Sequence, residues 1–246
     1  MSTHYSAHTV PSPLTPSDYR PISITPILSR LIERIVVTDY IYPSFQLPPT
    51  GLGFADQFAF QPSGSTTAAL VQLLHTITNL LQSNAYVIVY ALDFSKAFDT
   101  VRHSTLLDKL SLLHIPDHVY NWIEAFFRDH SHCTKFGDET SSSQPITASI
   151  IQGSAIGPAA FVVTASDLGP VTYGNSILKY ADDTYLVIPA ANCQTCADEI
   201  DNIEQWAKEN NLMLNRKKSV EIVFVPPRSR RPPDIPPSSN TSHTTS

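Results

Sequence analysis

Apolar residues in this chain occur in two patterns, short continuous runs and helical spacing, and together they predict a mixed fold. The run Tyr86 to Leu92 is apolar throughout and ends at Asp93, as expected for a strand buried on both faces. Two further short runs, Val171 to Leu178 and Tyr185 to Ile188, flank the pair Asp182-Asp183. This arrangement predicts a β-hairpin with the acidic pair at or near its turn.

Helical spacing precedes and follows these strands. A helix is also expected from Gly157-Pro158 to about Leu168, since Pro is favoured in a first helical turn. Short strands are expected between Cys133 and Ile151, and strand-like segments at Leu212 to Leu214 and Glu221 to Val225. The other expected helices carry these apolar positions: Leu28, Leu31, Ile32, Ile35 and Val36; Leu70, Leu73, Leu74, Ile77 and Leu81; Leu106, Leu107, Leu110 and Leu113; Val119, Trp122, Ile123, Phe126 and Phe127; Ile200, Ile203, Trp206 and Ala207.

The order of these elements is strand, helices, hairpin, helix and strand. A split βαβ sheet backed by helices, an α+β fold, accommodates that order. The chain has 246 residues with 42% hydrophobic and 15% charged content, which is enough to bury a sizeable core. Residues 1–17 are polar and interrupted by Pro, and residues 226–246 are rich in Pro, Ser and Thr. Both segments are expected to be disordered.

Net charge, cysteine spacing and the lengths of the apolar runs narrow the possible functions and cellular location only slightly. The formal net charge is −6, whereas nucleic-acid-binding domains are usually basic, although a local basic groove can coexist with a negative total. Cys193 and Cys196 have the spacing of a metal knuckle, but no second Cys or His pair follows, so zinc is not expected. No apolar run reaches the length of a membrane span, and no signal-peptide pattern is present. We therefore expect an intracellular protein of the cytoplasm or nucleus that does not bind membranes.

The candidate chemistry lies in the carboxylates. Asp93 ends one strand, and Asp182 and Asp183 lie at a hairpin, so the three converge if these strands are neighbours about 4.8 Å apart. Aspartate oxygens suit Mg²⁺ or Mn²⁺, and two such ions support nucleotidyl transfer. The alternative from spacing alone is that these residues are helix caps, salt-bridge partners or a solvated Asp-Asp turn.

The motifs around these carboxylates resemble the reverse transcriptase domain of non-LTR (LINE-type) retrotransposons, in that family's order. The resemblance covers about Tyr19 to Phe224. Its segments are Tyr19-Arg20-Pro21-Ile22-Ser23, Phe58-Ala59-Phe60-Gln61-Pro62 to Thr67, Leu92-Asp93-Phe94-Ser95-Lys96-Ala97-Phe98-Asp99 with His103, Gln152-Gly153-Ser154-Ala155-Ile156-Gly157-Pro158, Tyr180-Ala181-Asp182-Asp183 and Leu214-Asn215-Arg216-Lys217-Lys218-Ser219.

The resemblance implies a right-hand polymerase fold over residues 18–225, with fingers at about 18–84 and an antiparallel palm sheet at about 85–225. The thumb is expected to be absent. It also implies an RNA-directed DNA polymerase that uses an RNA template, a DNA primer and deoxynucleoside triphosphates, with Mg²⁺ or Mn²⁺ as cofactor. Protein partners are not indicated.

The same resemblance implies roles for individual residues. Asp93, Asp182 and Asp183 would be catalytic and hold the metal ions. Phe98 would exclude the ribose 2′-hydroxyl, and Lys218 would neutralise phosphate charge or act as a general acid. The remaining nucleotide-binding positions are Gln61, Gln152 and Gly153, and the template and primer positions are Tyr180, Gly157 and Pro158.

Plainer interpretations stay open for several of these residues. Phe98 can be a core residue, Asp99 a cap, His103 a local hydrogen-bond partner, and Lys217 and Lys218 a solvated pair. Gln61 stands where the family usually has Arg, and a neutral amide supplies no charge to a triphosphate. The first alternative function is therefore a decayed or repurposed relic that folds and binds nucleic acid without polymerising. The second is an unrelated magnesium-binding α+β domain such as a nucleotidyl cyclase.

Overall fold

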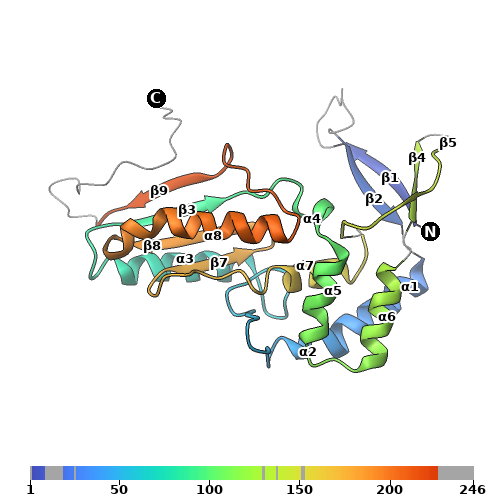
Figure 1. Ribbon diagram of the computed structural model, residues 1–246, viewed down its shortest axis with the longest axis horizontal. Helices are drawn as coiled ribbons and strands as arrows, with labels where there is room; N and C mark the ends of the chain where they lie inside the picture. The colour runs from blue at the N-terminus through green and yellow to red at the C-terminus, as the bar shows by residue number, and fades with distance from the viewer. Residues whose placement is uncertain are drawn as a thin grey trace.

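The structure is a computed structural model that describes residues 2–8, 19–24, 26–128, 131–136, 138–150 and 153–226. Within these ranges it holds two sheets at opposite ends of an elongated molecule (Figure 1). One is a four-stranded sheet in the order β7-β8-β3-β9, and the other joins β2, β1, β4 and β5, with β6 on β4. The predicted α+β composition is confirmed.

The four-stranded sheet is antiparallel throughout, and β3 (Val87–Leu92) is an inner strand of it. It pairs with β8 (Asp183–Pro189) on one side and with β9 (Val220–Phe224) on the other. The strand β7 (Ser176–Tyr180) completes the hairpin with β8. The predicted strand and hairpin are therefore both present, with the hairpin beginning at Ser176 rather than Val171.

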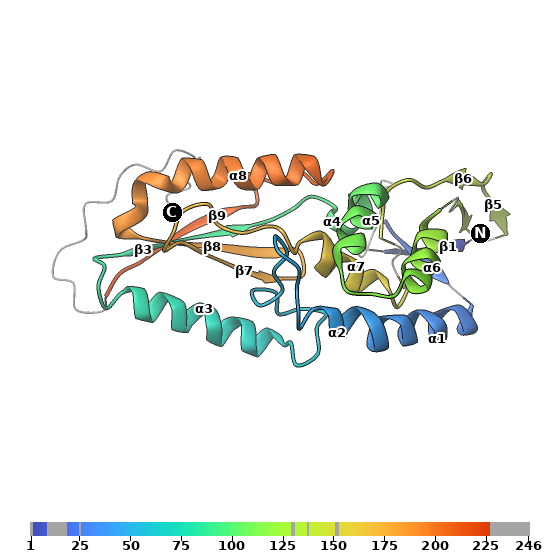
Figure 2. The same cartoon turned by 60° about the horizontal axis from the view of Figure 1, so that its bottom comes forward.

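Helices cover both faces of this sheet, with α8 (Cys196–Glu209) on one side and α3 (Thr66–Leu80) on the other (Figure 2). Val87 and Val89 of β3 pack with Ile77 of α3. Their neighbours Ile88 and Leu92 belong instead to the main core, which also contains Ile203 and Trp206 of α8. The alternation of a strand therefore serves two cores, which is why its sequence is apolar at every position.

The predicted apolar periodicities coincide with α1 (Ile27–Val36), α5 (His103–Leu112) and α6 (Asp117–Phe127), whereas the shorter helical elements were not predicted. Ser65 caps α3 by accepting a hydrogen bond from the Ala68 N–H at 3.1 Å, and Pro116 precedes α6 as predicted. The elements are α1 (Ile27–Val36), a π-helical turn (Val37–Ile41), α2 (Tyr42–Ser44), α4 (Ala97–Thr100), α5 (His103–Leu112), α6 (Asp117–Phe127), α7 (Gly157–Thr164) and a 3₁₀ turn (Ala190–Thr195).

The second sheet includes residues 2–8, part of the segment 1–17 that the sequence predicts to be disordered, and for these residues the prediction is wrong. Residues Ser2–His8 form β1, which pairs antiparallel with β2 (Tyr19–Ile24) and parallel with β4 (Ser131–Phe136). The partner β4 is more than a hundred positions away, so composition near the N-terminus gives no sign of the pairing. Short strands β5 (Glu139–Thr140) and β6 (Gln144–Pro145) also pair with β4, as the Ser-rich turn predicts. Residues 9–18 and the predicted tail after Pro226 lie outside the described residues.

Two other boundaries differ from the prediction. Helix α7 ends at Thr164, four residues before Leu168. The backbone turns beyond Thr164, and the carbonyls of Ala165 and Leu168 accept hydrogen bonds from Lys179. The strand-like segment Leu212 to Leu214 contributes only an isolated bridge between Leu214 and Phe94.

The apolar stripe predicted on α1 is largely exposed. Leu28 is 72% exposed and Leu31 is 54% exposed, whereas Glu33 on the same helix is fully buried. The helix prediction is correct, but its apolar face does not lie in the core of the described chain. None of the helices in the described ranges is long and apolar enough to cross a membrane.

Candidate active site

The acidic pair lies at the tip of the β7–β8 hairpin. Tyr180 pairs with Asp183, which leaves Ala181 and Asp182 as a two-residue loop. On the other side of β8, Thr184 pairs with Leu92, the last residue of β3. Asp93 follows Leu92 directly and therefore lies next to Asp183 at the same end of the sheet. The sequence-predicted convergence of a strand-end aspartate with a hairpin pair is thus built by strand register.

These carboxylates interact electrostatically. The pKa of Asp183 is raised by partial burial and further raised by the negative charges of Asp182 and Asp93. Like charges disfavour each other's ionised forms, and a divalent cation would relieve that repulsion. In the part of the chain that the structure describes, no three His, Cys, Asp or Glu side chains are already gathered as a metal cluster. The oxygen-only donor set and the mutual repulsion fit a hard cation.

A segment near the C-terminus fixes the backbone on either side of Asp93. The Asp93 N–H donates to Ser219 Oγ at 3.2 Å, and the Asn215 N–H donates to the Asp93 carbonyl at 2.7 Å. The lysine motif of residues 214–219 therefore holds the strand end that carries Asp93. Lys218 itself is exposed in a turn of this segment.

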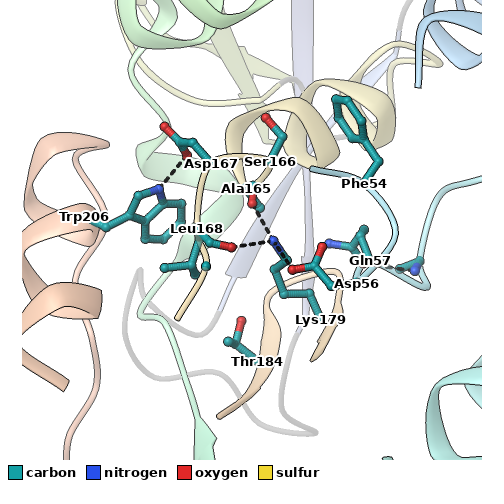
Figure 3. Close-up of polar contacts among 12 residues, drawn as sticks. Phe54, Asp56, Gln57, Ala165, Ser166, Asp167, Leu168, Lys179, Thr184 and Trp206 are labelled. Atoms are coloured by element: carbon teal, nitrogen blue, oxygen red, sulfur yellow. Dashed lines mark hydrogen bonds and ion pairs between the residues drawn. The ribbon is translucent and has the colours of Figure 1, made fainter. Parts of the chain in front are cut away.

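Strand β7 of the hairpin carries a buried lysine that the sequence analysis missed (Figure 3). Lys179 is 1% exposed, and its Nζ lies 2.9 Å from Asp56 Oδ2. The same Nζ donates to the carbonyls of Ala165 at 2.7 Å and Leu168 at 2.9 Å, just beyond the end of α7. Burial lowers the pKa of Lys179, and the Asp56 carboxylate counteracts that effect. This lysine therefore fastens β7 to α7 and to the loop before α3.

That loop lies alongside β7 as a short parallel partner. The Lys179 N–H donates to the Asp56 carbonyl at 2.7 Å, and the Phe58 N–H donates to the Lys179 carbonyl at 2.8 Å. Gln57, between these two residues, is 5% exposed and forms side-chain hydrogen bonds with the backbone of Ala181. One signal in the sequence was available: a lysine directly after the apolar run that precedes the acidic pair needs a partner if it is buried.

Phe98 and Gln61, both predicted to contact nucleotide, have intramolecular partners. The Phe98 ring is half-buried, stacks on Phe161 of α7 with ring centroids 4.4 Å apart, and meets the edge of Phe60 at 6.1 Å. The Gln61 Nε2 donates to the Phe54 carbonyl at 2.9 Å. Phe98 therefore lies on the rim of the core, and Gln61 braces the loop that carries Gln57.

The loop before α7 depends on a second buried residue that the sequence analysis missed. Oε2 of Glu33 accepts from the N–H groups of Ala155 at 2.6 Å and Ile156 at 3.4 Å. Such bonds satisfy donors that a helix N-terminus leaves free, and the helix dipole favours a negative charge there. Gly153 has a φ of +99°, which favours glycine.

The other predicted positions of this region fall as follows. Gly157 is the first residue of α7, and its N–H donates to Ser154 Oγ at 3.0 Å. Pro158 is the second residue of the helix. Tyr180 ends β7 and is half-buried. Gln152, predicted to contact the nucleotide, lies outside the described residues.

His103 has the structural surroundings of a local hydrogen-bond partner. Its Nε2 lies 2.8 Å from the Ser149 carbonyl, its ring meets Phe127, and burial lowers its pKa. Cys193 and Cys196 are both free thiols.

Comparison with known proteins places this arrangement in a family. Residues 10–239 match the reverse transcriptase (RNA-dependent DNA polymerase) family. The chain belongs to the reverse transcriptase family. It is 28% identical over 233 residues to the RNA-directed DNA polymerase from mobile element jockey of Drosophila melanogaster, covering 86% of this chain and 24% of that protein.

A second relative is the retrovirus-related Pol polyprotein from type-1 retrotransposable element R2 of Popillia japonica, at 26% identity over 84% of this chain and 30% of that protein. The chain is thus a distant homologue of non-LTR retrotransposon polymerases over most of its length. It spans about a quarter of the length of the relatives it matches.

Solved structures support the fold. Telomerase from Candida tropicalis in complex with a fragment of telomeric RNA has a TM-score of 0.63 at 13% identity, covering 90% of this chain and 41% of that one. The apo telomerase truncated from its C-terminal domain gives a TM-score of 0.58 at 12% identity, over 84% of this chain and 48% of that one.

Proposed function

We propose that this chain is the polymerase core of an RNA-directed DNA polymerase of the non-LTR type. It would extend a DNA primer on an RNA template with deoxynucleoside triphosphates. The observation that carries the proposal is the strand register that brings Asp93, Asp182 and Asp183 to one end of an antiparallel sheet, in a chain of the reverse transcriptase family. Family membership supplies the reaction class, and the coupled carboxylates supply residues able to perform it.

Asp93, Asp182 and Asp183 would hold Mg²⁺ or Mn²⁺. Bound there, such ions lower the pKa of an attacking hydroxyl and stabilise a leaving phosphate oxygen. The chain's own part is to hold the three carboxylates in place through strand register and through the bonds around Asp93. The nucleotide and primer would lie over the end of the sheet, against residues predicted for them.

The proposal assigns those residues as follows. Phe98 forms the floor of the sugar site, and its stacking on Phe161 fixes the plane of the ring. Lys218, exposed near the end of β3, is available to a phosphate or to the pyrophosphate leaving group. Gln152, Gly153, Gly157, Pro158 and Tyr180 remain proposed contacts to nucleotide, template and primer.

In the same proposal residues from about 85 to 225, including the four-stranded sheet and α8, are the palm. Residues from about 18 to 84 are the fingers, and their last helix, α3, packs on the palm sheet. The split βαβ topology of the palm is supported by the antiparallel order β7-β8-β3-β9. A polymerase that binds duplex also needs contacts to phosphates. The chain has 16 Lys and Arg against 22 Asp and Glu, so weak, distributive extension is expected.

One observation favours the alternative of a relic that folds and binds nucleic acid without polymerising. Gln61 stands at the family's Arg position, and its amide donates to the Phe54 carbonyl rather than being free for phosphate. An amide in that bond offers a triphosphate no charge, and one of its two N–H donors is already used. The intact acidic residues favour the polymerase.

Primer extension distinguishes the two functions. The purified chain is mixed with excess primer annealed to an RNA template, at low salt, with Mg²⁺ or Mn²⁺. Extension that is lost in Asp182→Asn supports the polymerase, whereas extension that persists in that variant contradicts it. No extension, even after Gln61→Arg, supports the relic. A Phe98→Ala variant that incorporates ribonucleotides more readily would support the proposed sugar site.

A further inference from the structure

Gln57 is a buried polar residue in contact with the hairpin loop Ala181-Asp182, which the proposed function makes the catalytic loop. Its Oε1 accepts from the Ala181 N–H at 2.9 Å and from the Ala59 N–H at 3.0 Å. Its Nε2 donates to the Ala181 carbonyl at 3.4 Å. The amide therefore binds both backbone groups of the residue immediately before Asp182, from a position 124 residues earlier in the chain.

Ala181 needs such support because its backbone is unusual. Its φ is +56°, in the left-handed region that favours glycine, and it is the first residue of the two-residue hairpin loop. The Ala181 carbonyl belongs to the same planar peptide group as the Asp182 N–H. A bond that fixes this carbonyl therefore fixes the plane from which the Asp182 side chain projects.

The chemistry of an amide is what this contact requires. A carboxylate at position 57 accepts from Ala181 but cannot donate to it, and an aliphatic side chain does neither. The amide also adds no charge beside three carboxylates that already repel one another. The surrounding backbone is held independently, because Asp56 and Phe58 bond to Lys179 through their main chains. Loss of the side chain thus leaves the loop in place.

We infer that Gln57 is a positioning residue for Asp182, which sets the catalytic loop for cation binding through the backbone of Ala181. The inference rests on the proposed function. It predicts that removing the amide weakens cation binding and turnover while deoxynucleotide KM changes little. Outer-shell residues that orient metal ligands typically contribute about 10–100-fold to metal affinity or activity.

Asn175 provides a matched control at the other end of β7. It is also a buried amide, 7% exposed, and its Nδ2 donates to Thr195 Oγ1 and to Glu199 Oε1. It lies at the end of the hairpin remote from Asp182. Asn175→Leu removes a buried amide without touching the catalytic loop, so it measures the effect of lost stability alone.

The test measures Mn²⁺ binding to the full chain by electron paramagnetic resonance, thermal unfolding, and kcat and KM for dTTP on an RNA template. Gln57→Met, which keeps the length but not the bonds, is expected to raise the Mn²⁺ dissociation constant about tenfold or more. Gln57→Glu, which keeps the acceptor, is the second variant if Gln57→Met does not fold, and it too is expected to weaken binding. Asn175→Leu is expected to lose thermal stability and bind Mn²⁺ like the unaltered chain.

The outcomes separate this inference from the proposed function. Mn²⁺ binding that Asp182→Asn weakens but Gln57→Met and Gln57→Glu do not would overturn the inference alone. Equal weakening in Asn175→Leu would also overturn it, because the effect would then follow stability. Mn²⁺ binding that Asp182→Asn leaves unchanged would overturn the proposed function and the inference together.

Discussion

Lys179 and Asp183 lie four positions apart on one hairpin, but the surroundings of their charges differ: opposite charge lies next to Lys179, and like charge lies next to Asp183. The lysine is buried, with an ion pair and two carbonyls around it. The aspartate is exposed at the tip of the hairpin, where partial burial and two neighbouring carboxylates raise its pKa. The lysine is therefore charge-compensated, whereas the hairpin tip carries like charges that a bound cation would compensate.

A cluster of like charges in a folded chain needs contacts that oppose its repulsion. Lys179, two positions before the hairpin loop, supplies such contacts. It joins β7 to the segment after α7 and to the loop before α3. The repelling carboxylates at the tip favour binding of a cation.

The largest expected effect comes from discharging the tip. Asp182→Asn should lower primer extension by more than about 100-fold, because even outer-shell partners of metal sites typically contribute 10–100-fold. Thermal stability should not fall, since the change removes one of three repelling charges. The measurement is single-nucleotide extension beside a melting curve. A variant that melts much earlier would mean that Asp182 holds the fold rather than the cation.

The next effect comes from removing the carboxylate that pairs with Lys179. Asp56→Ala leaves the Lys179 ammonium buried without its carboxylate, and breaking a buried pair typically costs about 3–5 kcal/mol of unfolding free energy. Chemical denaturation measures this loss. The paired change Asp56→Ala with Lys179→Met should recover much of the stability. If the single change cost no more than a surface pair, the Lys179–Asp56 pair would not anchor the hairpin.

Much of this comparison could be foreseen from the sequence, and one half of it could not. The apolar run before Asp93 and the two runs around Asp182 predict the strands, and strand register then brings the acids together. The contacts of Asp56, Gln57 and Glu33 have no periodicity, because each joins segments that are remote in the chain. Only the side-chain chemistry of the folded protein reveals them. The exposed stripe on α1 escaped prediction for a related reason: periodicity indicates a helix but not what lies against it.

A smaller effect is expected on the nucleotide side of the tip. Gln61→Arg replaces a neutral amide by a guanidinium, and a charge-assisted hydrogen bond typically contributes about 1.5–3 kcal/mol. The KM for deoxynucleotide should fall about tenfold or more by that figure, with little change in template affinity. Steady-state kinetics and filter binding measure the two. A variant that gained only template affinity would place position 61 away from the triphosphate.

The smallest effect concerns pH. Since partial burial, and then the charges of Asp182 and Asp93, raise the pKa of Asp183, its carboxylate is ionised and available to a cation only at a higher pH than an ordinary aspartate. Mn²⁺ affinity should therefore increase as pH rises through that raised pKa. Asp93→Asn removes one repelling charge and should shift the same rise to lower pH. A rise that stays at the same pH in this variant would show that Asp93 does not act on Asp183.

The fully buried Glu33 on the largely exposed α1 has a consequence for how this protein tolerates substitution. On most helices apolar positions resist substitution and polar ones vary. On α1 the order is inverted, because Glu33 bonds the loop before α7 while Leu28 and Leu31 face outward. Saturation mutagenesis of this helix should therefore show low tolerance at Glu33 and high tolerance at Leu28 and Leu31. Lysine at positions 28 and 31 would be a practical route to a less aggregation-prone preparation.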